Sequence, residues 1–201
     1  MEQKRVFLKE KREILLQDED DISISILQNG EVQGGFLFDE PLGGYGGGAI
    51  MLSPTEQYLL FSYYSGQSEE AFILFEIESS ALKVVYETDY LYGEEANYRF
   101  SEDESVLFQT MRTGCWCEDE MDEAGFYEFG AINCLKIQEK QFQQHCVHIF
   151  PGEDWEEDVT DVGEFEVTEV WEHQLSITTP WGKEIVDLPL KDVIVFKPES
   201  L

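Results

Sequence analysis

The sequence has little positive charge. Its 201 residues hold 13 Lys and Arg against 43 Asp and Glu, which gives a formal net charge of −30 at pH 7. Residues 1–12 carry +3 by themselves, whereas residues 13–82 and 141–182 contain neither Lys nor Arg. Such a surface repels phosphate backbones and anionic lipid headgroups, so the charge disfavours both nucleic-acid binding and membrane binding. A protein with a basic surface is the partner that the charge favours.

Long apolar runs and secretory signals are also missing. The basic start is followed by EILLQ and then DEDD, not by a continuous apolar segment of the kind that a signal peptide needs. No run approaches the length that spans a bilayer. The four cysteines are therefore expected to be reduced thiols, and the protein is expected to be cytoplasmic.

The sequence lacks the common catalytic motifs. It contains no G-x-S-x-G, no H-E-x-x-H, no phosphate-binding Walker loop and no dinucleotide fingerprint. There are three histidines, and two of them lie in one predicted strand. With 43 acids a pair of carboxylates can always be imagined, so such a pair indicates nothing. We expect no enzymatic activity, and an unrecognised hydrolase is the alternative.

Short segments rich in Val, Ile, Phe and Tyr alternate with turn residues throughout the chain, which predicts an all-β fold. ISISIL and EVQGGFLF flank Asn29-Gly30, a strong signal for a β-hairpin. Three further strand–turn–strand units are predicted in the same way. They are FILFEI–ESSA–LKVVYE, INCLKI–QEKQ–FQQHCVHIF and QLSITT–PWGK–EIVDLPL.

One stretch of the chain is repeated. Residues 52–66 read LSPTEQYLLFSYYSG and residues 100–114 read FSEDESVLFQTMRTG, with an offset of 48 that holds without a gap. Ser53, Glu56 and Gly66 align with Ser101, Glu104 and Gly114. Beyond the glycines the offset becomes 60, so the second copy carries a twelve-residue insertion within CWCEDEMDEAGFYEFG. The repeating unit is therefore four strands in about 50 residues, which is typical of arrays and propellers.

The motif SPTEQYLLFS resembles the turn and strand of β-propeller blades in TolB-like and prolyl-peptidase propellers, over about residues 48–150. It departs from the family at Thr55-Glu56, where Asp-Gly is usual, and at Glu102, where Pro is usual. The resemblance implies a propeller-like array of about four four-stranded antiparallel units within one β-rich domain. A β-sandwich or a meander is the alternative. The expected units are residues 3–40, 48–89, 95–150 and 155–196.

Two acidic segments are candidates for binding a partner. The insertion contains EDEMDE, and residues 152–161 read GEDWEEDVTD, with a tryptophan among the acids. An aromatic side chain surrounded by carboxylates is typical of a surface that binds a basic protein, as in inhibitor and immunity proteins. The predicted contact residues are Trp155, Glu156, Glu157, Asp158, Asp161, Glu118, Asp119 and Glu120.

A set of thiols and imidazoles is the alternative site. Cys115, Cys117, His145 and His148 could supply four ligands to zinc, although C-x-C is a poorer chelating spacing than C-x-x-C. We expect no cofactor, and zinc at these four residues is the second hypothesis. Cys134 and Cys146 lie on the two arms of the third predicted hairpin, where they could be neighbours across the two strands.

Overall fold

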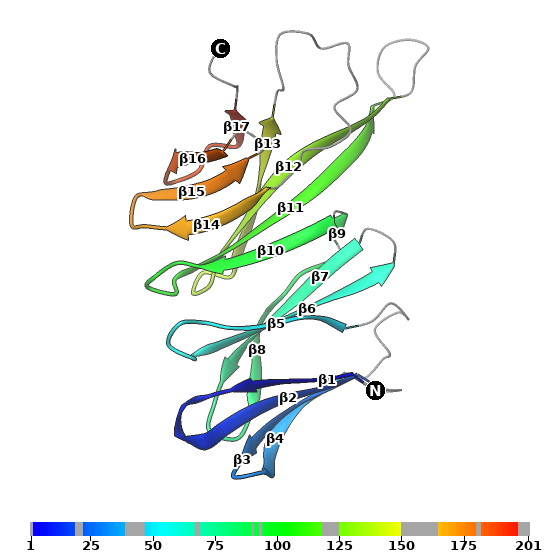
Figure 1. The fold of residues 1–201 in the computed structure, drawn as a ribbon, viewed down its shortest axis with the longest axis vertical. Coiled ribbons are helices and arrows are strands. Elements are labelled where there is room, and N and C mark those ends of the chain that lie inside the picture. The colour runs from blue at the N-terminus through cyan, green and yellow to red at the C-terminus, as the bar shows by residue number, and fades with distance from the viewer. Residues whose placement is uncertain are drawn as a thin grey trace. The chain divides into compact units, whose positions relative to one another are not determined.

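The computed structural model describes residues 2–18, 22–38, 47–66, 69–89, 91–92, 94–117, 125–149, 165–179 and 182–196. Seventeen strands, β1 to β17, run through these residues, together with one short 3₁₀ helix at Lys9–Lys11. The predicted all-β class is confirmed (Figure 1). In the described ranges no helix has the length and apolar character to cross a membrane. The chain divides into two compact units, Met1–Leu91 and Tyr92–Leu201, while the expectation of a single domain stays a prediction.

Unit 1 contains two sheets, each an antiparallel meander in chain order. Sheet 1 consists of β1 (Glu2–Phe7), β2 (Arg12–Asp18), β3 (Ser23–Gln28) and β4 (Glu31–Leu37). Sheet 2 consists of β5 (Gly47–Leu52), β6 (Tyr58–Gly66), β7 (Glu69–Ile77) and β8 (Leu82–Glu87), with β9 (Leu91–Tyr92) pairing β7. The predicted Asn29-Gly30 hairpin is present, and both residues adopt positive φ, as this turn requires.

Unit 2 also contains two sheets. Sheet 3 consists of β10 (Glu94–Phe100), β11 (Val106–Cys117), β12 (Gly125–Lys136) and β13 (Gln141–Ile149), with β17 (Val193–Phe196) added parallel to β13. Sheet 4 consists of β14 (Glu166–Val170), β15 (Gln174–Thr179) and β16 (Gly182–Asp187). The prediction of four successive antiparallel sheets is confirmed. The last sheet, however, has three strands among the described residues, and β17, which lies within the last expected unit, joins sheet 3.

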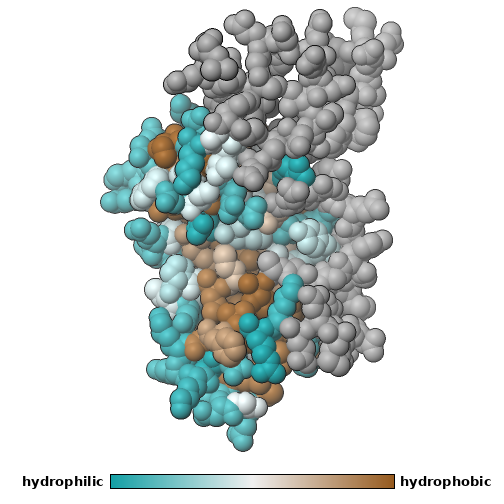
Figure 2. Space-filling model, in the orientation of Figure 1, coloured by the Kyte–Doolittle hydropathy of each residue, from teal (hydrophilic) through white to brown (hydrophobic). Residues whose placement is uncertain are grey.

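The core of unit 1 lies between sheets 1 and 2. Alternate residues of sheet 1 such as Ile14 and Ile24 are fully buried, and they share one cluster with Phe61 and Phe75 of sheet 2. Aromatic rings join the two sheets, since the centroid of Phe36 lies 4.9 Å from that of Phe75. On the face drawn in Figure 2, hydrophobic residues gather over the two sheets of this unit. Each buried aromatic or aliphatic side chain contributes about 1.5–3 kcal/mol to the stability of this packing.

Gly34 allows sheets 1 and 2 to approach closely at their outer strands. A Cβ atom built on Gly34 would lie 1.9 Å from the backbone oxygen of Ser80, in the turn between β7 and β8. No side chain fits at that distance, so the backbone of β4 rests directly on this turn.

The core of unit 2 lies between sheets 3 and 4. Phe108, Ile132 and Val147 of sheet 3 form one cluster with buried residues of sheet 4 such as Leu175 and Ile177. Phe165 belongs to the same cluster and lies over Gly130, where an added Cβ would come within 2.8 Å of the ring. The absence of a side chain at Gly130 therefore allows the Phe165 ring to pack directly against β12.

Candidate functional site

The predicted partner-binding residues lie outside the described residues, but the strands that lead to them are described. The insertion follows the end of β11 at Cys117 and precedes the start of β12 at Gly125, and these two residues pair with each other. The second acidic segment follows the end of β13 at Ile149. Because β12 is antiparallel to both β11 and β13, the chain leaves sheet 3 for both segments at the same end of the sheet (Figure 1).

The two segments carry charge of one sign. Residues 118–124 contain five acids, and residues 150–164 contain seven. Neither segment contains Lys or Arg. Twelve carboxylates therefore belong to two segments that the chain enters from the same end of sheet 3. A high density of acidic charge produces a potential that attracts cationic surfaces.

The strand register does not bring the four proposed zinc ligands level with one another. His145 pairs with Ile132, and Ile132 pairs with Thr110, which precedes Cys115 by five residues along β11. At a rise of about 3.3 Å per residue this separates the two levels by roughly 17 Å, whereas ligand atoms on one zinc ion lie within about 4 Å of each other. Among the described residues no group of three or more His, Cys, Asp or Glu could hold a metal ion. Zinc binding therefore stays an untested hypothesis.

His145 has a structural contact instead. Its side chain is buried, and its Nδ1 lies 2.8 Å from the backbone oxygen of Lys191. Lys191 lies two residues before β17, so this hydrogen bond holds the segment that leads into the added strand. A second, longer bond from Gln143 Nε2 to Asp192 Oδ1, at 3.4 Å, links the same two regions.

The remaining cysteines of sheet 3 are not opposite one another. Cys134 pairs with Gln143 and Cys146 pairs with Ala131, so the suggestion that these thiols are cross-strand neighbours is wrong. Burial raises the pKa of the Cys134 thiol to about 12, although the nearby Lys136 ammonium lowers it in part. A thiol with this pKa stays protonated at neutral pH, so it is neither a nucleophile nor a ready metal ligand.

The repeated sequence motif forms the same turn in sheets 2 and 3. In each copy the serine hydroxyl accepts a hydrogen bond of 3.0 Å from a backbone N–H five residues on, Tyr58 for Ser53 and Val106 for Ser101. The glutamate three residues after each serine adopts a positive φ, 65° at Glu56 and 56° at Glu104. These are the positions where the resembling family has glycine, so the motif keeps the turn but places a side chain in a strained conformation.

The side chain of Glu56 links sheets 1 and 2. Its Oε2 accepts a hydrogen bond of 2.8 Å from the backbone N–H of Lys9, in the turn between β1 and β2. The Lys9 ammonium lies 4.0 Å from the other carboxylate oxygen. Glu104, the equivalent residue, is buried. The sequence does show an acid in both copies of the turn where glycine is usual. That the acid of the first copy links two sheets could be learned only from the structure.

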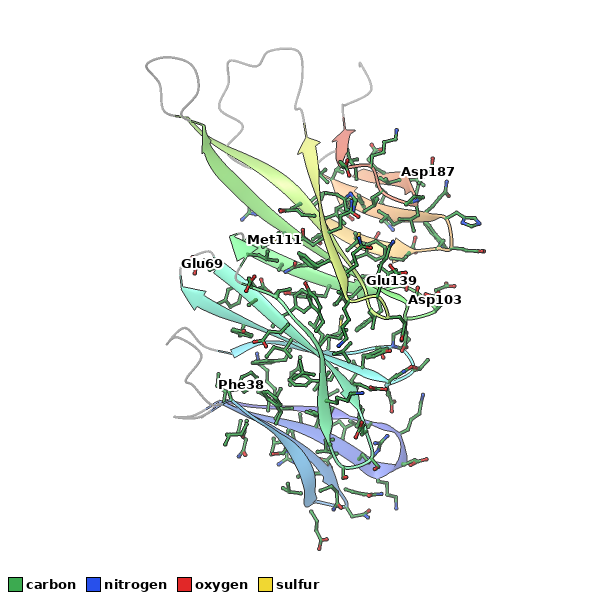
Figure 3. All side chains as sticks on the ribbon, turned by 180° about the vertical axis from the view of Figure 1, so that it is seen from behind. Phe38, Glu69, Asp103, Met111, Glu139 and Asp187 are labelled. Carbon is green, nitrogen blue, oxygen red and sulfur yellow. The ribbon has the colours of Figure 1, made fainter. Side chains whose placement is uncertain are left out.

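Asp103 closes the second copy of the turn. Its carboxylate accepts hydrogen bonds from the hydroxyls of Ser101 and Ser105, at 2.7 and 2.8 Å, and from the Ser105 backbone N–H at 3.0 Å. The hydroxyl of Ser101, followed by the two bonds from Ser105, holds the pKa of Asp103 below its ordinary value of 3.8. Figure 3 shows Asp103 and Glu139 in the two adjacent turns at one end of sheet 3.

A row of polar side chains crosses sheet 3, from the half-buried Tyr98 to the buried Gln109 and Asn133, and the sequence patterns did not predict it. Tyr98 pairs with Gln109, and Gln109 pairs with Asn133, so the three lie side by side on one face. Asn133 Nδ2 donates to Gln109 Oε1 at 2.9 Å, and Gln109 Nε2 donates to the Tyr98 hydroxyl at 3.0 Å. Polar residues in the interior of strands fix the register of the sheet, because a slip would leave each of these groups unpaired.

Comparisons with known proteins bear on the fold and not on the function. No known protein family matches the sequence, and no curated protein matches it. Solved structures with a similar arrangement include an uncharacterized protein from Listeria monocytogenes, with a TM-score of 0.48, 10% identity, and coverage of 92% of this chain and 54% of that one. The WD40 domain of SCAP from fission yeast has a TM-score of 0.42 and 11% identity, with coverage of 91% of this chain and 48% of that one. TolB from Acinetobacter baumannii has a TM-score of 0.32 and 11% identity, with coverage of 89% of this chain and 52% of that one. This chain spans about half of their lengths, and TolB, whose propeller family the sequence motif resembles, is among these structures.

Proposed function

We propose that this chain is a non-enzymatic, acidic protein-binding module that docks or neutralises a partner with a basic surface. The observation that supports the proposal is the gathering of twelve acids, without a single basic residue, in two segments that leave sheet 3 at the same end. Even if every Lys and Arg of the chain were paired, 30 carboxylates would stay without a basic partner in the chain.

The proposal assigns different roles to the acids and to Trp155. Carboxylates attract the partner over a long range, so they raise the association rate and make binding sensitive to salt. An aromatic side chain buried at the centre of an interface slows dissociation instead. The acids assigned to the interface are Glu118, Asp119, Glu120, Glu156, Glu157, Asp158 and Asp161.

The first step of the test is native mass spectrometry on the chain purified from its own host at low salt. The expected result is a second, basic protein that leaves when the salt concentration is raised. Its association and dissociation rates are then measured with the purified chain. A bare monomer at low salt, or a companion that salt does not release, would count against electrostatic docking.

The second step localises the interface by charge reversal. Glu156→Lys, Glu157→Lys and Asp158→Lys together should lower the association rate by about tenfold or more and weaken its salt dependence. The matched control reverses three exposed acids on described strands and turns, Glu87, Glu169 and Glu172, with the same change in net charge. If both triple variants slow association equally, net charge alone steers the partner and the assignment of the site is wrong.

The third step separates anchoring from attraction. Trp155→Ala should raise the dissociation rate and leave the association rate nearly unchanged. Trp171, whose side chain is 42% exposed next to β14, provides the control substitution Trp171→Ala. Equal effects of the two substitutions would remove Trp155 from the proposed interface.

A further inference from the structure

Sheet 1 has an apolar face on the side turned away from the core. In one row across its four strands, Phe7 pairs with Glu13, Glu13 with Leu27, and Leu27 with Val32. Paired residues have side chains on the same side of a sheet, and this row alternates with the buried residues Ile14 and Ile26. By the same alternation the face also carries Arg5, Leu15, Gln17, Ser23, Ser25, Gly35 and Leu37.

Three hydrophobic side chains of this face are unusually exposed. Phe7 is 71% exposed, Val32 65% and Leu37 61%, and no other large hydrophobic side chain of the described residues is as exposed as these three. Leu15 and Leu27 lie between them in the middle of the sheet and are buried, at 8% exposure each. Exposed apolar side chains around a buried apolar centre are typical of a sheet face that packs against another surface.

The same face is electrically neutral. Arg5 and Glu13 are its charged residues among the positions that the register assigns to it, and they bond each other at 3.2 Å. The described residues of sheet 1 and its turns, 2–18 and 22–38, contain five basic and five acidic residues. This neutrality stands out in a chain whose net charge is −30.

The outer face of sheet 4 provides a comparison. On the side away from its core, Glu169 pairs with Ser176 and Ser176 with Ile185, and Thr178 pairs with both Glu166 and Lys183. Ser176, in the middle of this face, is buried, whereas Glu169, Lys183 and Ile185 are exposed. Charged and hydroxyl side chains dominate that face, with Ile185 as the exposed apolar residue. The composition of the sheet 1 face is therefore not a general property of the exposed sheets in this chain.

We propose that the outer face of sheet 1 binds the same face of a second copy of this chain, as a two-fold symmetric dimer. In such an interface each apolar row meets its own equivalent, so a self-complementary hydrophobic patch is sufficient. Two chains of charge −30 repel each other, and the neutral face is where the repulsion at contact is least. A basic partner is attracted to the acidic segments and gains nothing from this face.

The size of the face indicates a small interface. Four strands about 4.8 Å apart and about 20 Å long give a footprint of roughly 350 Å² on each copy. This is less than half of the roughly 800 Å² per partner in a standard stable interface. The dimer should therefore be weak, with a dissociation constant between about 1 and 100 μM.

Sedimentation velocity of the full chain between about 5 and 500 μM tests the proposal at the concentrations that this affinity requires. The weight-average sedimentation coefficient should rise from monomer to dimer, and it should rise at lower protein concentration in 0.5 M than in 0.15 M NaCl, because salt screens the repulsion between copies. Docking of a basic partner weakens with salt, so the two proposals give opposite salt dependences and fail separately. A monomer at every concentration in both salts overturns the dimer.

Two substitutions on the face and one control elsewhere localise the contact. Phe7→Glu and Val32→Glu each place an acid opposite its own copy, and each should weaken the dimer at least tenfold. Both positions are exposed, so the fold should persist, which far-ultraviolet circular dichroism checks. Ile185→Glu adds the same charge at a 53% exposed position of β16 and should leave the dimer as it is. A dimer that survives both face substitutions, or that Ile185→Glu disrupts equally, overturns the assignment to sheet 1.

Discussion

At the scale of single residues, the chain has glutamate at the turn position where the propeller family that it resembles usually has glycine. A left-handed backbone conformation costs a residue with a Cβ about 1–2 kcal/mol relative to the ordinary conformations. At Glu56 the cost is offset by a charge-assisted hydrogen bond of 2.8 Å to the backbone N–H of Lys9. The turn of one sheet thereby holds the turn of its neighbour, which glycine could not do.

Two substitutions at position 56 separate the strain from the contact. Glu56→Ala keeps the positive φ and removes the carboxylate, so it should lower the free energy of unfolding by about 1–2 kcal/mol. Glu56→Gly removes the same carboxylate but relieves the strain, so its stability should lie between those of Glu56→Ala and the unchanged protein. Urea unfolding measures all three. Glu78→Ala, at an exposed acid in the next turn of sheet 2, is the control and should change stability by less than about 0.5 kcal/mol. Equal losses in the Ala and Gly variants would show that φ carries no cost here.

Asp103 gives a residue-scale prediction about pH. Hydrogen bonds from Ser101 and Ser105 lower its pKa below 3.8, so the carboxylate is bound more favourably in the folded than in the unfolded chain. This contribution is fully present above pH 3.8 and is lost as the pH falls through the lower folded value. Asp103→Asn should therefore lower the urea midpoint at pH 7, and the difference from the unchanged protein should shrink at pH 3. A difference that is the same at both pH values would contradict the assigned cause.

At the scale of elements, local patterns predicted the hairpins well because each hairpin is set by its own turn. Asn29-Gly30 determines the turn between β3 and β4 through two positive φ angles, and both copies of the repeat form the expected turn before a strand. The partner of the last strand could not be found this way. VIVF at residues 193–196 lies within the last expected unit, yet it pairs with β13 of sheet 3. His145 and Lys191, which are far apart in sequence, form a hydrogen bond between the same two regions.

The site was less predictable than the fold for a related reason. A register relates residues on different strands, and it decides that His145 lies level with Thr110 and not with Cys115. Composition revealed the acidic segments, but that they leave sheet 3 at the same end follows from strand directions. The polar row of Tyr98, Gln109 and Asn133 had no signal in the sequence, because amides and hydroxyls in a strand are ordinarily expected to face solvent.

The attachment of β17 gives the element-scale prediction. His145→Ala removes the hydrogen bond of 2.8 Å between the imidazole and the Lys191 backbone oxygen. We expect β17 to separate locally from β13, so backbone amides of 193–196 should exchange with deuterium about tenfold faster or more. Amides of β6 and β7, in the other unit, should keep their protection. His173→Ala, at the exposed histidine between β14 and β15, is the control. Unchanged exchange in His145→Ala would show that the apolar contacts of β17 hold it without the histidine.

At the scale of the whole molecule, the charge of −30 acts against folding. Compaction brings carboxylates closer together, so their mutual repulsion destabilises the folded state more than the expanded unfolded state. The described ion pairs reduce this repulsion locally, as between Lys83 and Glu76 at 3.2 Å, but the basic residues are too few to reduce it everywhere. The protein therefore depends on counterions in solution for part of its stability.

Added salt should accordingly raise the melting temperature, by on the order of 5 °C between about 0.02 and 0.5 M KCl, as the screening length falls from roughly 20 Å to roughly 4 Å. Choline chloride at equal ionic strength should have the same effect, because screening does not depend on the identity of the cation. Replacing Glu87, Glu169 and Glu172 by Gln should raise the melting temperature at low salt and change it little at high salt. A chelator should have no effect. If millimolar calcium or zinc raised the melting temperature well beyond choline chloride of equal ionic strength, the carboxylates or thiols would be binding a specific cation, and repulsion would not be the cause.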